Sequence, residues 1–225
     1  MNLSDNLHRV LASIESATHR AGRPPGSVRL VAVTKTWPAD VVREIVAAGQ
    51  LALGENKVQE LLGKAPELPA EVEWHLIGHL QQNKIRKVLP HCTLIHSVDS
   101  LPLATRISRI AGELGLTASL LLQVNVANDD AKFGFPAEAL RSVFGEIATL
   151  PHLRIGGLMT VPPYDDDPEK VRPHFRKLRQ LRDELATVYH CELPELSMGM
   201  SHDFAIAIEE GATLVRIGSA LFGSR

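Results

Sequence analysis

The sequence predicts one α/β domain, residues 1–225, folded as a TIM-like (β/α)8 barrel with an extra N-terminal helix. Eight short apolar runs alternate with longer segments of helical periodicity, which is the element order of such a barrel. Runs such as LVAV at 30–33 and SLLLQVNV at 119–126 are largely apolar on both faces, as covered parallel strands are. A length of 225 residues, without a Pro/Ser/Gly-rich linker or an internal repeat, fits a single domain of barrel size.

The N-terminal helix is predicted by Leu3, Leu7, Leu11 and Ile14, which recur at helical spacing before Gly22. The last predicted strand is followed only by residues 219–225, which are too few for a full closing helix. Because each barrel strand needs a covering helix, we expect the N-terminal helix to cover that part of the barrel.

The predicted strands are Val28–Val33, Leu51–Leu53, Val72–Ile77, Thr93–Val98, Ala118–Val126, Leu153–Met159, Glu195–Met198 and Thr213–Ile217. The predicted helices are Pro38–Ala48, Ser100–Leu114, Pro136–Leu150, Glu169–Tyr189 and Asp203–Glu210, with shorter helical crossovers near Glu55–Lys64 and Gln81–Leu89. An open doubly wound sheet is the alternative fold, but no G-x-G-x-x-G turn follows a first strand.

The charge balance disfavours binding to nucleic acid or an anionic membrane, because 24 Lys and Arg against 26 Asp and Glu give a net charge of −2. The two cysteines, Cys92 and Cys191, are too few for a disulfide framework and are expected to be buried or inert. We find neither a signal peptide nor an apolar run long enough to span a membrane, so a cytoplasmic setting is expected. A monomer is expected, since no large apolar surface stripe is evident.

In a barrel of this kind the functional residues lie at the carboxyl ends of the strands. Lys35 ends the first strand, LVAVTK, directly before a predicted helix. A lysine at this point is expected to have a partly desolvated amine of lowered pKa, able to form a Schiff base with an aldehyde. By position alone it fits an ordinary solvated lysine as well.

A phosphate site is predicted after the seventh and eighth strands, where barrels commonly make one. The seventh runs into SMGMS at 197–201 and the eighth into RIGS at 216–219. Glycines let the backbone approach a phosphate, and serine hydroxyls and free N–H groups donate to it. A phosphorylated aldehyde would bridge this cradle and Lys35, and pyridoxal 5'-phosphate has this form.

Seven segments, in order and over nearly the whole chain, carry a resemblance to a known family: VAVTKTWP at 31–38, GENKVQE at 54–60, WHLIGHLQQNK at 74–84, IHSVDS at 95–100, VNVANDDAKFG at 124–134, GLMTVPP at 157–163 and LSMGMSHDFAIAIEEGATLVRIGSALFG at 196–223. They resemble the pyridoxal-phosphate homeostasis proteins, whose fold is the barrel of alanine racemase-like enzymes. The resemblance implies that Lys35 carries pyridoxal phosphate as an internal aldimine. It also implies that the cofactor is surrounded by Asn56, Met198, Ser201, Arg216, Gly218 and Ser219, with Ser201 and the Gly218-Ser219 backbone at the phosphate.

In the related racemases an arginine faces the pyridine nitrogen, and a fixed cation there weakens the ring as an electron sink. If Arg216 does the same, transamination and aldol-type chemistry are disfavoured; the alternatives are a salt bridge or a phosphate contact. Racemisation also needs a second acid/base on the opposite face of the substrate. The chain has no room for the added domain that supplies it in racemases, and its only tyrosines are Tyr164 and Tyr189.

We therefore expect a non-catalytic carrier or regulator that takes part in pyridoxal-phosphate homeostasis and passes the cofactor to apo-enzymes, as the resemblance also implies. The alternative is a minimal racemase-like enzyme that depends on pyridoxal phosphate. A third hypothesis is a phosphosugar enzyme that uses the same cradle, with Glu55 and Asp99 as its candidate general bases.

Other residues have weaker functional interpretations. A metal site is one interpretation of His75, His79, His91 and His96, but their spacing favours polar groups near the barrel mouth. Ser201-His202-Asp203 spells a triad only by accident, since triad members meet through folding. The basic run of Lys84, Arg86 and Lys87 fits a solvated helix face or an anionic ligand. Lys132 fits a plain loop lysine or a secondary aldehyde acceptor.

Overall fold

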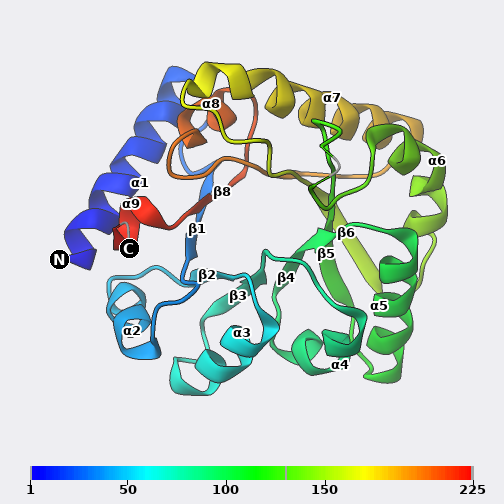
Figure 1. Cartoon of the computed structure of the whole chain (residues 1–225), viewed down its shortest axis with the longest axis horizontal. Helices are drawn as coiled ribbons and strands as arrows, with labels where there is room; N and C mark the ends of the chain where they lie inside the picture. The colour runs from blue at the N-terminus through cyan, green and yellow to red at the C-terminus, as the bar shows by residue number, and fades with distance from the viewer. Residues whose placement is uncertain (1, 130, 224–225) are drawn as a thin grey trace.

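A computed structural model describes residues 2–129 and 131–223 and shows a closed barrel of parallel strands in the order β1 to β8 (Figure 1). The predicted barrel is confirmed, and its closure pairs β1 with β8, where Val31 lies opposite Arg216. The strands are β1 Arg29–Val33, β2 Ala52–Glu55, β3 Glu73–Leu76, β4 Leu94–Val98, β5 Ala118–Gln123, β6 Leu153–Met159, β7 Glu195–Ser197 and β8 Leu214–Ile217.

The helices follow the strands around the outside of the barrel (Figure 1). They are α1 Leu3–Arg20, α2 Ala39–Ala47, α3 Val58–Lys64, α4 Ile85–Val88, α5 Leu101–Glu113, α6 Ala137–Ala148, α7 Arg172–Val188, α8 Phe204–Glu209 and α9 Ser219–Phe222, with 3-10 turns at Ala65–Glu67, Gln82–Lys84, Leu89–His91 and Pro168–Val171. Most predicted bounds differ from the observed ones by one to three residues. The fifth strand ends at Gln123 because Val124 pairs with Phe135 in an isolated bridge, and β2 extends to Glu55, which was expected to begin a helix.

Helix α1 covers the part of the barrel that α9, with four residues, is too short to cover, as predicted. It packs against α8, α9 and α2, and Asn6 Nδ2 donates a hydrogen bond to the Leu221 carbonyl at 2.6 Å. Its buried stripe contains Leu3, Leu7, Val10 and Ile14. The expectation for Leu11 was wrong, because that side chain is 41% exposed and Val10 takes its place in the stripe.

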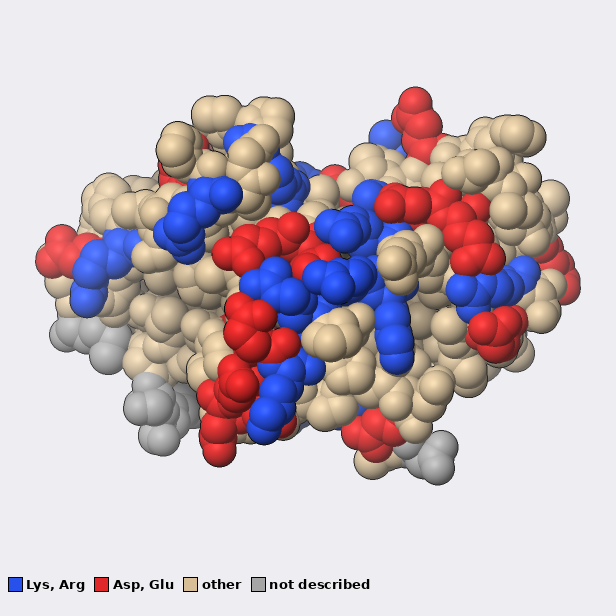
Figure 2. Space-filling view, turned by 90° about the horizontal axis from the view of Figure 1, so that it is seen from above, with Lys and Arg blue, Asp and Glu red and all other residues tan. Residues whose placement is uncertain are grey.

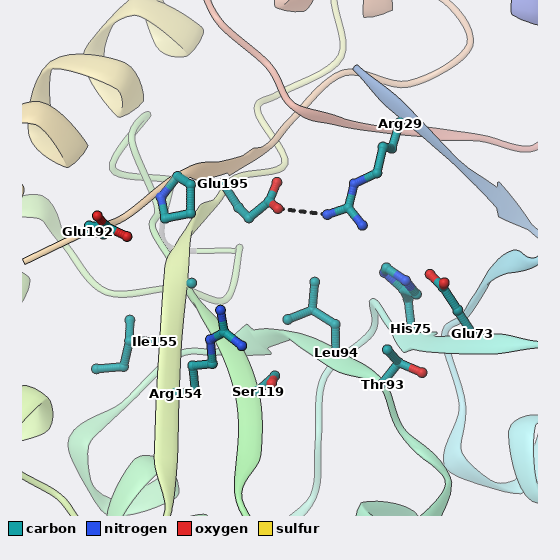
Figure 3. A pocket seen from close by; sticks show the side chains of 12 residues that line it. Arg29, Glu73, His75, Thr93, Leu94, Ser119, Arg154, Ile155, Glu192 and Glu195 are labelled. Carbon is teal, nitrogen blue, oxygen red and sulfur yellow. Dashed lines mark hydrogen bonds and ion pairs between the residues drawn. The ribbon is translucent and has the colours of Figure 1, made fainter. Parts of the chain in front are cut away.

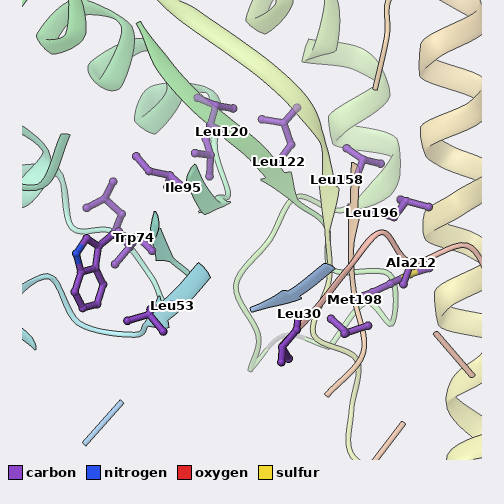
Figure 4. Close-up of a cluster of buried hydrophobic side chains, with 14 of the residues drawn as sticks. Leu30, Leu53, Trp74, Ile95, Leu120, Leu122, Leu158, Leu196, Met198 and Ala212 are labelled. Atoms are coloured by element: carbon purple, nitrogen blue, oxygen red, sulfur yellow. The ribbon is translucent and has the colours of Figure 1, made fainter. Parts of the chain in front are cut away.

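The alternation of side chains along each strand divides the apolar core into two layers. An outer layer fills the space between strands and helices, and Figure 4 shows part of it, including Leu30, Ile95 and Met198. A small inner layer lies inside the barrel and consists of Val31, Leu94, Leu121, Met159 and Leu214.

Polar side chains occupy the rest of the barrel interior. His75, His96, Ser197 and Arg216 are buried; His96 follows Ile95 of the outer layer, and each of the other three is flanked in sequence by two residues of that layer. Because a buried polar group is costly unless it is hydrogen-bonded, this arrangement needs an internal network, which is described below.

The outer face that carries α7 and α8 mixes both signs of charge (Figure 2). Arg172, for example, forms ion pairs with Glu169, Glu209 and Glu210. This face therefore offers no continuous basic surface. Within the described residues, no helix combines the length and apolarity needed to cross a bilayer.

Candidate functional site

A cavity of about 450 Å³ lies at the carboxyl ends of the strands. Six of the seven predicted cofactor-binding residues line it: Lys35, Asn56, Ser201, Arg216, Gly218 and Ser219. They come from the loops after β1 and β2 and from the ends of β7 and β8, which barrel closure makes neighbours although they lie far apart in sequence. We call this the mouth cavity.

Lys35 is held between two anchored residues. Before it, the Thr34 N–H donates to the Gly54 carbonyl, and Thr34 Oγ1 donates to Glu55 Oε1 at 2.7 Å. After it, the Thr36 N–H donates to Glu60 Oε2 at 2.6 Å, and Thr36 adopts a positive φ of 67°, which is uncommon for a residue with a side chain. The chain therefore fixes the backbone of Lys35 at the edge of the mouth cavity.

The Lys35 amine makes no hydrogen bond or ion pair with any residue that the structure describes. Lys132 and Lys64, in contrast, both donate to backbone carbonyls. The expectation of a desolvated Lys35 was wrong: the residue lines the mouth cavity but is exposed.

A buried ion pair supports the Lys35 loop from below. Lys64 Nζ donates to Glu55 Oε1 at 2.5 Å and to the Thr34 carbonyl at 2.8 Å, and both side chains are buried. Burial raises the pKa of Glu55, and the hydrogen bonds from Lys64 and Thr34 oppose that shift. The Glu55 carboxylate is thus already bound by Lys64 and Thr34, which argues against its expected role as a general base. The other candidate, Asp99, pairs with His79 at 3.0 Å.

The predicted phosphate cradle is assembled by two neighbouring loops. Gly218 precedes the first residue of α9, and the Ala220 N–H donates to Ser201 Oγ at 3.3 Å, which joins the loop after β7 to the one after β8. A Cβ added to Gly218 would meet only Val33, at an ordinary 3.4 Å, and the φ of Gly218 is −119°. Neither the backbone nor the packing therefore requires glycine at 218, but a side chain there would occupy space next to the cavity.

Arg216 lies on β8, two residues before Gly218, where it lines the inner end of the mouth cavity, and it is only 4% exposed. Its Nη1 donates to Ser197 Oγ at 2.6 Å and its Nη2 donates to the Thr160 carbonyl at 2.8 Å. Burial lowers the pKa of Arg216 to about 10, so the guanidinium remains a cation at neutral pH. Arg216 forms no salt bridge with a described residue. Its position therefore fits a contact with a ligand better than a structural salt bridge, which was one of the expected alternatives.

Met198 does not line the mouth cavity. Its side chain is fully buried in the outer layer of the core, while the preceding Ser197 points into the barrel interior. The alternation along β7 explains this, because neighbours in a strand point to opposite faces.

Ser197, Thr160 and His96 support Arg216 and were not predicted to take part in the site. Ser197 Oγ also lies 2.8 Å from His96 Nδ1, and His96 Nε2 lies 2.8 Å from His75 Nδ1. A signal for them was present in the sequence: each is a polar residue that directly follows an apolar residue in, or at the end of, a predicted strand.

Tyr164 and His202 form the exposed rim of the mouth cavity. Their rings are 5.4 Å apart, and Tyr164 is 71% exposed. Asp166 raises the pKa of Tyr164 by hydrogen bonding to it. Tyr189 packs instead on Phe144, away from the cavity. The run 201–203 forms no triad, because His202 Nε2 lies near the Asp166 carbonyl and Asp203 accepts from the Met200 N–H.

The described residues contain no cluster of three or more potential metal ligands, and the histidines have other contacts. His79 stacks on Phe133, whereas His75 and His96 lie inside the barrel and not at the mouth, contrary to the expectation. Burial raises the pKa of the Cys92 thiol to about 12 and also raises that of Cys191, which favours inert thiols.

The two remaining basic candidates have structural contacts. Arg86 pairs with Glu113 on the helical surface. Lys132 Nζ donates to the Pro162 carbonyl at 2.8 Å and the Val161 carbonyl at 3.3 Å, so it braces the loop after β6. These contacts favour a structural role for Lys132.

Comparison with known proteins agrees with this architecture. The family described as alanine racemase, N-terminal domain, matches residues 6–225. Proteins named "Pyridoxal phosphate homeostasis protein" from Aquifex aeolicus and Pseudomonas aeruginosa are 47% and 44% identical; the alignments cover 100% and 99% of this chain and 99% and 96% of theirs.

Solved structures extend the comparison. PipY of Synechococcus elongatus, determined with PLP bound, shares 41% identity and a TM-score of 0.86, over 98% of this chain and 100% of that one. An alanine racemase of Clostridium difficile shares only the fold, with 16% identity and a TM-score of 0.76 over 100% of this chain and 57% of the racemase. The chain thus belongs to the alanine racemase N-terminal domain family and, within it, to the pyridoxal phosphate homeostasis proteins.

Proposed function

We propose that this protein binds pyridoxal 5'-phosphate in the mouth cavity, holds it on Lys35 through a Schiff base, and serves as a carrier in pyridoxal-phosphate homeostasis. The observation that carries the proposal is that the unengaged Lys35 amine and the Ser201/Gly218/Ser219 cradle line one cavity. The relatives' names and the PLP-bound PipY structure support the same ligand.

The residues of the mouth cavity fit the chemical groups of the cofactor. The Lys35 amine suits the aldehyde, and bond formation between its nitrogen and the aldehyde carbon releases water. Ser201, Ser219 and the backbone N–H groups at the start of α9 suit the phosphate. The space beside Gly218, which a Cβ would reduce, leaves room for the phosphate to approach the backbone.

The position of Arg216 favours a protein that binds the cofactor reversibly over one that uses it in catalysis. Pyridoxal phosphate supplies an electron sink when its ring nitrogen is protonated. The buried cation of Arg216, fixed by Ser197 and Thr160, disfavours a proton at any ligand nitrogen that faces it. A carrier needs reversible attachment rather than turnover, and we infer that released cofactor passes to apo-enzymes in the cytoplasm.

The second candidate is a racemase-like enzyme, and one observation favours it. Tyr164 lines the mouth cavity and its raised pKa keeps the phenol protonated, so it has the form of a general acid. Against this, the ring is 71% exposed and no packing fixes it over a substrate beyond its contact with His202.

Absorbance spectroscopy tests the proposal. Wild-type protein titrated with pyridoxal phosphate is expected to gain the long-wavelength band of a protonated Schiff base, whereas Lys35→Ala is not. Lys57→Ala, which removes an exposed lysine near the same cavity, is the matched control and should behave as wild type. An unchanged band in Lys35→Ala would contradict the proposal.

Isotope exchange separates the two candidates. In heavy water, a carrier should exchange the α-proton of added amino acids no faster than free pyridoxal phosphate does. Rapid exchange that requires both Lys35 and Tyr164, measured with Lys35→Ala and Tyr164→Phe, would favour the enzyme.

A further inference from the structure

A second cavity, of about 440 Å³, lies at the opposite end of the barrel (Figure 3). It is lined by residues from the amino ends of the strands, among them Arg29 of β1, His75 of β3, Ser119 of β5 and Arg154 of β6. We call it the basal cavity. The basal cavity and the mouth cavity lie at opposite ends of the strands and have no lining residue in common.

A buried polar atom without a partner borders the basal cavity. His75 is 2% exposed, and its Nε2 makes no hydrogen bond within the described residues. Because a buried polar atom without a partner is costly, His75 Nε2 points to a partner that enters from the cavity.

The hydrogen-bond chain from Arg216 determines what His75 Nε2 offers. Arg216 is a pure donor, so Ser197 Oγ accepts from it, and the acceptor that the structure gives the Ser197 hydroxyl proton is His96 Nδ1. His96 then carries its proton on Nε2 and donates it to His75 Nδ1. Burial and Arg29 lower the pKa of His75 to about 4, so the ring is neutral and its one proton lies on Nε2. The basal cavity therefore presents an N–H donor that lacks an acceptor.

The charged groups around the cavity narrow the class of ligand. Figure 3 shows the guanidinium groups of Arg29 and Arg154 pointing into it from opposite sides. Arg29 is neutralised by Glu195 at 2.7 Å, whereas Arg154 forms no ion pair with a described residue. Glu73 and Glu192 also line the cavity and likewise lack an ion-pair partner there. With more carboxylates than guanidiniums, the cavity disfavours a dianion such as phosphate.

We propose that the basal cavity binds a small zwitterion of the amino-acid type, with its carboxylate accepting from His75 Nε2 and Arg154 and its ammonium group facing Glu73, which lies beside His75 (Figure 3). The ligand carboxylate gives His75 Nε2 the acceptor that it lacks and pairs with the Arg154 guanidinium. The ligand ammonium group in turn faces a carboxylate of the cavity wall. Glu73 and His75 suit this arrangement because residues two apart in a strand point to the same face.

The test uses protein without added pyridoxal phosphate, so it is independent of the function proposed above. Glycine, L-alanine, L-glutamate, acetate and inorganic phosphate are titrated separately into isotopically labelled protein. Nuclear magnetic resonance of the His75 imidazole reports contact, and calorimetry gives affinity. We expect at least one of the amino acids to bind with a dissociation constant below about 1 mM and to shift the His75 Nε2 signal.

Variants assign the two ends of the ligand. Arg154→Ala should weaken amino-acid binding at least tenfold, while Arg106→Ala, an exposed arginine on α5, should leave it unchanged. Glu73→Gln should weaken glycine binding but not acetate binding. All these substitutions lie at exposed residues, so misfolding does not obscure the result.

Three outcomes would overturn the proposal. The first is that no amino acid of the panel moves the His75 signal at 10 times the expected dissociation constant, about 10 mM. The second is tighter binding of phosphate than of any amino acid. The third is amino-acid binding that Arg154→Ala leaves unchanged.

Discussion

Arg216 and Ser197 are joined by a hydrogen bond of 2.6 Å from Nη1 to Oγ, and the same hydroxyl lies 2.8 Å from His96 Nδ1. One serine thus connects the cation beneath the mouth cavity with the histidine pair of the barrel interior. The side chains of Arg216, Ser197, His96 and His75 are all buried. Each hydrogen bond among them therefore provides a partner for a polar atom that water cannot reach.

Ser197→Ala should lower the free energy of unfolding by roughly 1–3 kcal/mol, because it leaves buried atoms of Arg216 and His96 without a partner. Urea denaturation measures the loss. Ser13→Ala removes a hydroxyl that bonds a backbone carbonyl on the exposed face of α1 and should change stability by less than about 0.5 kcal/mol. Equal losses in the two variants would show that the hydrogen bonds joining Arg216, Ser197 and His96 make no specific contribution to stability.

Lys64→Met should destabilise the protein by roughly 3–5 kcal/mol, because it leaves the carboxylate of Glu55 buried without its cation. Its matched control is Lys57→Met, which removes an exposed lysine 3.9 Å from Glu60 and should cost less than about 1 kcal/mol. Chemical denaturation again gives the values. A small loss in Lys64→Met would mean that Glu55 takes up a proton without cost.

Gly218→Ala should weaken binding of pyridoxal phosphate while leaving the unfolding midpoint unchanged, because the new Cβ meets only Val33 at ordinary distance. Gly78→Ala should lower the unfolding midpoint, because its Cβ would clash with the Asn56 carbonyl oxygen and the backbone must shift; since both residues line the mouth cavity, cofactor binding should weaken as well. Cofactor titration and thermal unfolding of both variants separate the two effects. Unchanged affinity in Gly218→Ala would argue against a phosphate close to that backbone.

Stability should fall as the pH decreases below about 6.5, the ordinary pKa of histidine. Burial lowers the pKa of His75 to about 4 and lowers that of His96 well below its ordinary value, and the nearby cations Arg29 and Arg216 act in the same direction. Between these pH values the unfolded chain binds protons that the folded chain does not, so each histidine costs up to about 1.4 kcal/mol per pH unit.

Urea midpoints at pH 5 to 7 measure this dependence, and NMR of the two imidazoles checks its cause. Neither ring of the folded protein should become protonated above pH 5, whereas both should in urea-unfolded protein. Protonation of His75 near pH 6.5 in the folded state would contradict the assignment of both buried imidazoles as neutral.

The element order and much of the mouth were predictable from the sequence because both depend on local patterns. Strand runs, helix periodicity and the strand-end positions of Lys35 and Gly218-Ser219 follow from spacing alone, once the barrel is assumed. Placing Met198 at the cofactor did not follow, because it required the inward register of β7, which belongs to Ser197.

The basal cavity and the exposure of Lys35 were not predictable for a different reason. Both depend on how completely side chains fill the two ends of the barrel, which is a property of three-dimensional packing. His75 illustrates the limit: the sequence shows a histidine in an apolar strand, but only the fold shows that one of its nitrogens lacks a partner.

Borohydride reduction followed by peptide mapping tests most directly whether Lys35 holds the cofactor. The protein is incubated with pyridoxal phosphate, reduced and digested, and the pyridoxyl-phosphate mass is located by mass spectrometry. The adduct is expected on the peptide that contains Lys35, at one per chain. An adduct confined to another lysine, such as Lys132, with Lys35 unmodified, would contradict the proposed function.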